Sequence, residues 1–193
     1  LHVAGFSTGP TGFAVNMAGA IPFAAKGTGA EYRAYNLIVV VKASSPYQKL
    51  TDLKGKKVGH TSASSNSGNL APRALFPALD LKPDTDYTVA YSGGNDKSIL
   101  GVISGDYDAG TVASDVFDRM IVRGTIKKED VRVIYRSAPF PTSSFAYSYD
   151  LEPALAAKVK KCFYDYRFPP EMTKEFNGDD RFFPITYKKD WEV

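Results

Sequence analysis

The stretch Lys57–Asn69 reads KVGHTSASSNSGN, a short apolar strand that enters a long turn of small polar residues. Thr61–Asn69 holds hydroxyl and amide residues, one alanine and one glycine, without any charge, and a helical pattern begins at Leu70. The first N–H groups of a helix lack internal partners, and the helix dipole is positive there. The stretch therefore predicts either a capped helix start or a pocket in which neutral donors hold an oxyanion.

Apolar runs typical of strands alternate with helical patterns on both sides of this turn. Leu37–Val41 is continuous and β-branched, which predicts a central parallel strand buried on both faces. Further strands are predicted at Val3–Phe6, Val58–His60, Thr88–Tyr91, Ala109–Val112, Val131–Tyr135 and Phe145–Tyr149. The longest helix is predicted over Glu152–Tyr166. This alternation predicts an α/β fold with mostly parallel sheets.

Polar clusters follow four of the predicted strands at their carboxyl ends, where ligands bind in α/β sheets. These clusters are Ser7-Thr8, Ser64–Ser67, Ser92–Asn95 and Ser114-Asp115. Any one of them could instead form a turn or a helix cap. Their shared position favours ligand contact for the group. Thr142–Ser144 precedes a strand, so this rule does not place it.

Composition narrows the choice of partners. The chain has 193 residues, 44% of them apolar, which is enough for one domain or two small lobes. Its net charge of +3 predicts neither a nucleic-acid nor a membrane-surface partner, and no apolar run reaches the roughly 18 residues of a membrane span. The single cysteine, Cys162, lies among apolar residues of a predicted helix and is expected to be buried. We expect no metal centre and no cofactor.

The sequence lacks the usual motifs of hydrolytic enzymes. No lysine follows Gly68, so the polar turn is not a phosphate-binding loop of a nucleotide hydrolase. No histidine lies after His60, which removes the usual general base for a serine nucleophile. Donors without a base or a nucleophile indicate a binding protein rather than an enzyme.

Specific motifs point to one family. Gly9-Pro10 precedes a helix, Tyr35 precedes the apolar run at 37–41, and Ser65–Gly68 reads Ser-Asn-Ser-Gly. On these motifs the chain resembles, over residues 3–191, the substrate-binding proteins of ABC transporters for phosphonates, phosphite and hypophosphite, whose turn reads Ser-Thr-Ser-Gly. Asn95 stands where relatives often carry a histidine, and Ser143 stands where some carry an acid.

The resemblance implies a type II periplasmic binding protein fold, with two α/β lobes joined by a two-strand hinge. Lobe one would comprise residues 1–42 and 137–193, and lobe two residues 43–136, with pivots at Lys42–Ser44 and Arg136–Thr142. The chain opens on Leu1–Phe6, an apolar run typical of the interior of a strand. We therefore expect lobe one to be truncated at its start.

The resemblance also implies a passive binding function in the cleft between the lobes. The residues expected to contact a small phosphorus oxyanion are Ser7, Thr8, Tyr35, Ser64, Ser65, Asn66, Ser67, Asn95, Asp115 and Ser143. The expected partner is an ABC transporter permease, and the expected location is the periplasm, or a lipid anchor outside a Gram-positive cell. A ligand-sensing domain of a signalling protein is the alternative, and an enzyme of the same fold is a third interpretation.

Overall fold

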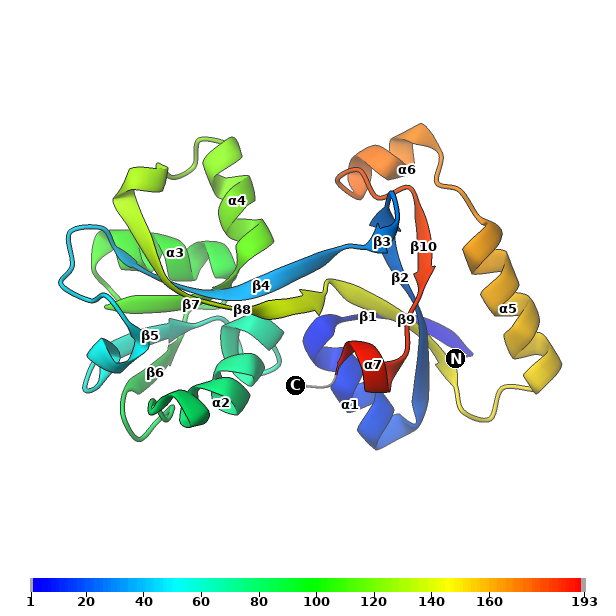
Figure 1. Cartoon of the computed structure of the whole chain (residues 1–193), viewed down its shortest axis with the longest axis horizontal. Coiled ribbons are helices and arrows are strands. Elements are labelled where there is room, and N and C mark those ends of the chain that lie inside the picture. The colour runs from blue at the N-terminus through cyan, green and yellow to red at the C-terminus, as the bar shows by residue number, and fades with distance from the viewer. Residues whose placement is uncertain (1, 192–193) are drawn as a thin grey trace. The chain divides into compact units, whose positions relative to one another are not determined.

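The computed structural model describes residues 2–191, which form two compact units (Figure 1). The central unit comprises Tyr35–Pro139, and the terminal unit comprises the described residues 2–34 and 140–191. The chain passes from one unit to the other inside two strands, β4 (Ala34–Lys42) and β8 (Val131–Pro141). These boundaries lie eight and three residues away from those expected at 42/43 and 136/137, because β4 already pairs within the central sheet.

The central unit is built on a five-stranded sheet in the order β6-β5-β7-β4-β8. β5 (Lys57–His60) pairs in parallel with β6 (Thr88–Tyr91) and with β7 (Ala109–Ala113). β4 is fully buried over 37–41, as predicted, but it runs antiparallel to β7. The expectation of a parallel strand was wrong because a continuous apolar run reports burial on both faces, whereas its direction depends on the connections.

Helices cover both faces of the central sheet (Figure 1). An unbroken helical run after β5 comprises a π-turn (Asn66–Leu70), α2 (Ala71–Leu75) and a 3-10 turn (Phe76–Leu79). The other helical segments are α3 (Asn95–Ser104), α4 (Ser114–Val122) and the 3-10 turns Leu50–Leu53 and Lys128–Asp130. The core between the sheet and α3 and α4 includes Ile38, Val40, Ile99, Val102, Val112 and Phe117.

The terminal unit is built on an entirely antiparallel sheet in the order β1-β9-β2-β10, with β3 paired to β2. Its strands are β1 (Val3–Ser7), β2 (Ala20–Thr28), β3 (Glu31–Tyr32), β9 (Ser143–Ser148) and β10 (Arg181–Pro184). The prediction of mostly parallel sheets is therefore wrong, and the structure is a mixed α/β fold. Strands that lie far apart in the chain pair here in opposite directions, and no local pattern encodes that choice.

The terminal helices are α1 (Thr8–Ala18), α5 (Pro153–Asp165), α6 (Pro170–Glu175) and α7 (Tyr187–Asp190). The core beneath α5 is aromatic, and Phe23 meets Phe163 edge to face with ring centroids 4.9 Å apart. Within residues 2–191, every helix is too short or too polar to span a lipid bilayer.

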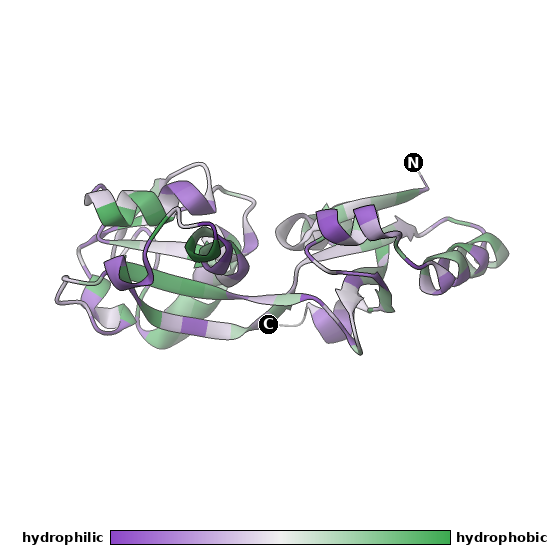
Figure 2. Ribbon diagram, turned by 90° about the horizontal axis from the view of Figure 1, so that it is seen from above, coloured by the Kyte–Doolittle hydropathy of each residue, from purple (hydrophilic) through white to green (hydrophobic). Residues whose placement is uncertain are grey.

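Cys162 is exposed on α5, so the expectation that it is buried was wrong. Ala156, Val159 and Phe163 form the face of α5 that packs on the core. Cys162 is rotated by about 100° from Phe163 around the helix and falls outside that face. Figure 2 shows hydrophilic and hydrophobic residues alternating along α5. In such an amphipathic helix a small residue such as cysteine can lie on the core face or on the solvent face.

Candidate ligand-binding site

The topology of the central sheet brings several of the predicted site residues to one edge. β5, β6 and β7 run parallel, so the turns that follow them leave the sheet on the same side. Leu37 pairs with Ala113 at the end of β7, which brings the residues just before Leu37 to that edge as well. We call this group the central cluster; its members are Tyr35, Ser64, Ser65, Asn66, Ser67, Asn95 and Asp115.

The turn Thr61–Asn69, called the β5 turn below, is closed by its own hydrogen bonds. The Ser65 Oγ accepts from the Gly68 amide at 3.2 Å and caps the helical run. The Ser65 carbonyl accepts from the amides of Asn69 and Leu70 at 3.0 and 2.9 Å. Within residues 2–191, the amides of Asn66 and Ser67 donate to no other group. The turn therefore leaves two backbone donors at the start of the helical run.

Gly68 is required by close packing inside this turn. A Cβ at position 68 would lie 1.6 Å from the Thr61 Oγ1 and 2.8 Å from the Ser65 Oγ. The Gly68 carbonyl accepts from the Thr61 amide at 3.1 Å and from the Thr111 Oγ1 at 2.9 Å. The glycine of the Ser-Asn-Ser-Gly motif thus lets the turn fold tightly onto β5 and β7.

The side chains of the β5 turn present neutral donors. The Asn66 Nδ2 donates to the Tyr35 hydroxyl at 3.2 Å, which joins Tyr35 to the turn. Ser67 is only 2% exposed, and its hydroxyl forms no hydrogen bond with the other described residues. The Ser65 hydroxyl accepts from Gly68 but keeps its own proton for donation. Ser64 is exposed. Such donors suit an anion that arrives with its own charge.

Asn95 and Asp115 are held by other bonds at the same edge. The Asn95 Oδ1 accepts from the Ala113 amide at 2.9 Å and so ties the start of α3 to β7. The Asp115 carboxylate forms an ion pair with Arg119 at 2.8 Å, one turn along α4. Ligand contact by either side chain has to be compatible with these bonds, and their predicted roles stay predictions.

The terminal unit holds the other three predicted site residues. Ser7 and Ser143 are partners in the pairing of β1 with β9, and Thr8 follows Ser7. The Thr8 Oγ1 donates to the Pro141 carbonyl at 2.6 Å. Ser7 is exposed, and its side chain makes no cap bond to α1. The Ser143 Oγ is buried and has no hydrogen-bond partner among the described residues.

Sequence reasoning missed a buried polar network beneath the β5 turn. His60 ends β5 and is fully buried, with its Nδ1 2.9 Å from the Asn69 Oδ1 and its Nε2 3.0 Å from the Tyr87 hydroxyl. Burial is the main cause that lowers the pKa of His60 to about 4. The three residues are separated by nine and by 27 positions in the chain. No local spacing rule connects them, so only the fold brings them together.

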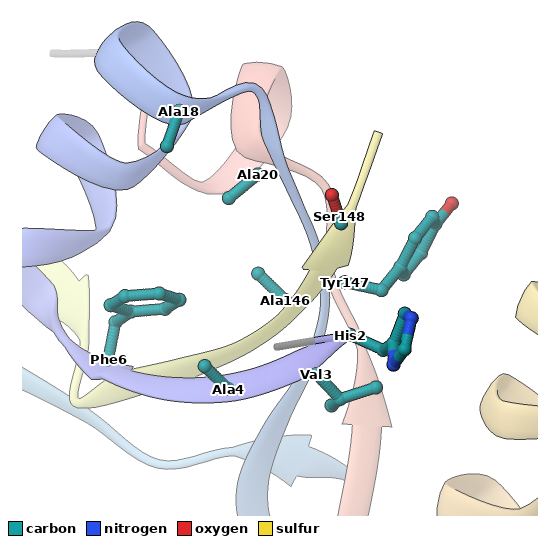
Figure 3. Close-up of a pocket in the computed structure, with 9 residues that line it drawn as sticks. All are labelled: His2, Val3, Ala4, Phe6, Ala18, Ala20, Ala146, Tyr147 and Ser148. Atoms are coloured by element: carbon teal, nitrogen blue, oxygen red, sulfur yellow. The ribbon is translucent and has the colours of Figure 1, made fainter. Parts of the chain in front are cut away.

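Two cavities lie elsewhere in the units. One, of 170 Å³ in the terminal unit, is lined mainly by small apolar residues, including Ala4, Ala18, Ala20 and Ala146 (Figure 3). The other, of 310 Å³ in the central unit, lies between α3 and α4 beside Arg119 and Arg123. Neither is lined by residues of the β5 turn. Among residues 2–191, no three histidine, cysteine or acidic side chains come together as a metal site.

Comparison with known proteins finds a family model that matches nearly the whole chain and curated relatives that match part of it. A family model described as "ABC transporter, phosphonate, periplasmic substrate-binding protein" matches residues 1–191. The "Phosphate-import protein PhnD" of Mycolicibacterium smegmatis is 31% identical over 122 residues, which cover 59% of this chain and 38% of the relative. The "Phosphonates-binding periplasmic protein" of Escherichia coli is 24% identical over 141 residues, which cover 71% and 42%. The chain thus spans about two fifths of the length of these curated relatives.

Solved structures share the fold at low sequence identity. XAC2383 from Xanthomonas citri, bound to ATP, has a TM-score of 0.82 at 19% identity, covering 96% of this chain and 72% of that one. PhnD1 from Prochlorococcus marinus, in complex with methylphosphonate, has a TM-score of 0.75 at 18% identity, covering 98% and 74%. These similarities confirm the predicted fold class, that of the periplasmic binding proteins.

Proposed function

Since the chain belongs to the family of periplasmic substrate-binding proteins of phosphonate ABC transporters, we propose that it binds a small phosphorus oxyanion for import. The proposed ligand is a phosphonate, phosphite or hypophosphite. The observation that carries the proposal is the β5 turn, where the hydroxyl of Ser67 and the amides of Asn66 and Ser67 have no partner within the described residues. An oxyanion supplies the acceptors that these donors lack.

In the proposed complex, oxygens of the anion accept hydrogen bonds from the β5 turn. The hydroxyls of Ser65 and Ser67 and the two turn amides are the principal donors. Tyr35, Ser64, Asn66 and Asn95 are proposed as further contacts, and Asp115 as an acceptor for a ligand that carries its own donor. Ser7, Thr8 and Ser143 are proposed contacts from the terminal unit.

The number of donors is sufficient for useful affinity. A hydrogen bond to a charged group contributes roughly 1.5–3 kcal/mol, and micromolar affinity requires about 8 kcal/mol. Three or four good donors could therefore hold an oxyanion at micromolar concentration once desolvation and ordering are offset. We propose that binding bends β4 near Ala34 and Tyr35, rather than at Lys42–Ser44, and β8 within Arg136–Thr142, where the two strands pass between the units. We also propose that a permease receives the ligand. The proposed location is the periplasm or a lipid anchor outside the cell.

Isothermal titration calorimetry of the chain with a panel of anions tests this function. The panel contains methylphosphonate, 2-aminoethylphosphonate, phosphite, hypophosphite, phosphate and sulfate. We expect saturable, one-to-one binding of at least one phosphorus oxyanion and weaker binding of sulfate. The variant Cys162→Ser, which alters an exposed side chain on α5, serves as a control and should bind as the unmodified chain does. Absence of binding by every phosphorus compound in the panel would overturn the proposal.

A further inference from the structure

His60 occupies a position where an apolar side chain would be easier to bury. It ends β5, the strand between β6 and β7, and its exposed fraction is 0%. The imidazole lies beside the ring of Tyr87, with ring centroids 5.8 Å apart. Burying two polar nitrogens is unfavourable unless both are hydrogen bonded. A histidine is therefore stable at this position only because both of its nitrogens have hydrogen-bond partners.

Both ring nitrogens of His60 are hydrogen bonded, and the donor and acceptor of each bond can be assigned. The Asn69 Nδ2 donates to the Ala63 carbonyl at 2.8 Å, so its Oδ1 is the atom that faces the His60 Nδ1 at 2.9 Å. The Nδ1 must then carry the proton, and the Nε2 accepts from the Tyr87 hydroxyl at 3.0 Å. The bonds run from Tyr87 through His60 and Asn69 to the backbone of the β5 turn.

The Asn69 side chain forms hydrogen bonds with residues of β5, of the β5 turn and of α2. Its Oδ1 also accepts from the Arg73 Nε at 3.0 Å and from the Tyr91 hydroxyl at 3.4 Å. Its own amide donates to the Ser65 carbonyl at 3.0 Å. Asn69 thus fixes the carbonyls of Ala63 and Ser65, and the residues around and after these two carbonyls carry the proposed anion donors.

We infer that His60 is a positioning residue, which acts with Tyr87 and Asn69 to hold the β5 turn in its binding conformation before the ligand arrives. This inference rests on the proposed function of the turn. A turn that is already ordered loses less conformational entropy when it binds an anion, so the buried network sets the affinity without touching the ligand. The network does not depend on which phosphorus oxyanion binds.

Two substitutions separate positioning from bulk stability. His60→Phe keeps a planar ring of similar size and removes both hydrogen bonds. Tyr87→Phe removes only the hydroxyl and is the milder change. Tyr135→Phe is the matched control, because Tyr135 lies in the same unit, packs edge to face on Phe76 and forms no side-chain hydrogen bond with the described residues.

The ligand-free protein gives a readout that does not require binding. Hydrogen exchange followed by NMR measures how often the amides of Gly68, Asn69 and Leu70 open. We expect these amides to exchange at least tenfold faster in His60→Phe and about threefold faster in Tyr87→Phe, with no change in the core strand β4. The ring ¹⁵N shifts should show a single Nδ1-protonated tautomer in the unmodified chain and the same tautomer in Tyr87→Phe, because the Asn69 Oδ1 still faces the Nδ1.

Calorimetry with methylphosphonate gives the functional readout. We expect Kd to rise at least tenfold in His60→Phe and about threefold in Tyr87→Phe, with Tyr135→Phe unchanged. The inference is overturned if turn exchange and Kd stay the same in both variants, or if exchange rises equally throughout the central unit. If the unmodified chain binds no anion, the proposed function fails, whereas the exchange experiment still decides whether His60 orders the turn.

Discussion

The β5 turn and the first turn of α1 look alike in the sequence and differ in how their hydroxyls are used. In the α1 turn, Ser7–Thr11, the Thr11 Oγ1 contacts the Ser7 carbonyl and the Ser144 Oγ at 3.0 and 2.8 Å, and the Thr8 Oγ1 bonds to Pro141. In the β5 turn a buried histidine and asparagine stabilise the backbone, so the Ser67 hydroxyl remains without an internal partner. The two turns thus differ in what holds their backbone: the threonine hydroxyls of the α1 turn bond within the terminal unit, whereas the β5 turn is held by His60 and Asn69 beneath it.

The largest expected effect comes from adding one methyl group to the β5 turn. In Gly68→Ala the new Cβ would lie 1.6 Å from the Thr61 Oγ1, so the β5 turn must open. We expect a loss of about 3 kcal/mol in unfolding free energy, the upper range for overpacking, and no measurable anion binding. Urea denaturation and calorimetry measure the two effects.

Gly12→Ala is the matched change in α1. The new Cβ would meet only the Tyr187 hydroxyl, at 3.4 Å. Alanine is the better helix former, so we expect unchanged or slightly raised stability. If both glycine variants behaved alike, the contrast in packing between the β5 turn and helix α1 would be wrong.

The next effect follows from the pKa of His60, which burial lowers from 6.5 to about 4. The charge of nearby Arg73 lowers this pKa further, whereas the hydrogen bond to Asn69 and the charge of Asp84 raise it. The unfolded chain binds a proton in this range and the folded chain does not, so stability falls as pH decreases from about 6.5 to about 4. We expect about 2 kcal/mol of this loss between roughly pH 7 and pH 5. The α1 turn contains no titratable side chain and should not respond.

Denaturant titrations of the unmodified chain and of His60→Phe at both pH values isolate this contribution. The variant should lose about 2 kcal/mol less over the interval, since the contributions of the other titratable groups are common to both proteins. Equal pH dependence in the two proteins would show that the buried imidazole does not resist protonation.

A tenfold effect on affinity is expected when the donors of the β5 turn are removed. Ser65→Ala combined with Ser67→Ala deletes two hydroxyls, and we expect Kd for the best-bound anion of the panel to rise at least tenfold. Loss of the Ser65 cap should also lower stability by about 1 kcal/mol. Ser62→Ala, at an exposed position of the same turn, is the control. Affinity equal to that of the unmodified chain would place the anion site elsewhere.

The smallest expected effect concerns Thr8. Thr8→Val preserves the shape of the side chain and removes the 2.6 Å hydrogen bond to the Pro141 carbonyl. Because this bond is buried, thermal or urea denaturation should show a loss of about 1 kcal/mol. Unchanged stability would mean that the Thr8 hydroxyl contributes nothing to the fold and is as available as that of Ser67.

Periodicity and turn chemistry predicted most elements of the central unit. The strands β5, β6 and β7 and the helices between them follow from apolar runs, glycine ends and polar turns. The direction of β4 did not follow, nor did the extension of β8 to Pro141, which was expected to end at Tyr135. Strand pairing and direction depend on distant segments, and side-chain patterns report only which faces are buried.

Only part of the candidate site could be predicted, because local sequence patterns do not show which distant residues come into contact. Tyr35 and Asn66 were each expected from the resemblance to contact the ligand, and in the structure the Asn66 Nδ2 donates to the Tyr35 hydroxyl at 3.2 Å. The use of Thr8 inside the terminal unit and the network around His60 were not expected, because both depend on contacts between residues far apart in the chain. A histidine at the end of a buried strand was the available signal, since such a residue requires two partners.

The chain contains one tryptophan, Trp191, and its indole Nε1 donates to the Thr8 carbonyl at 3.0 Å. All tryptophan fluorescence of this chain therefore arises beside Thr8, the first residue of α1. The emission spectrum is an intrinsic optical probe of that location and needs no attached dye. A shift of the emission maximum on addition of methylphosphonate would report a rearrangement there, and it could be followed in stopped flow to time the event.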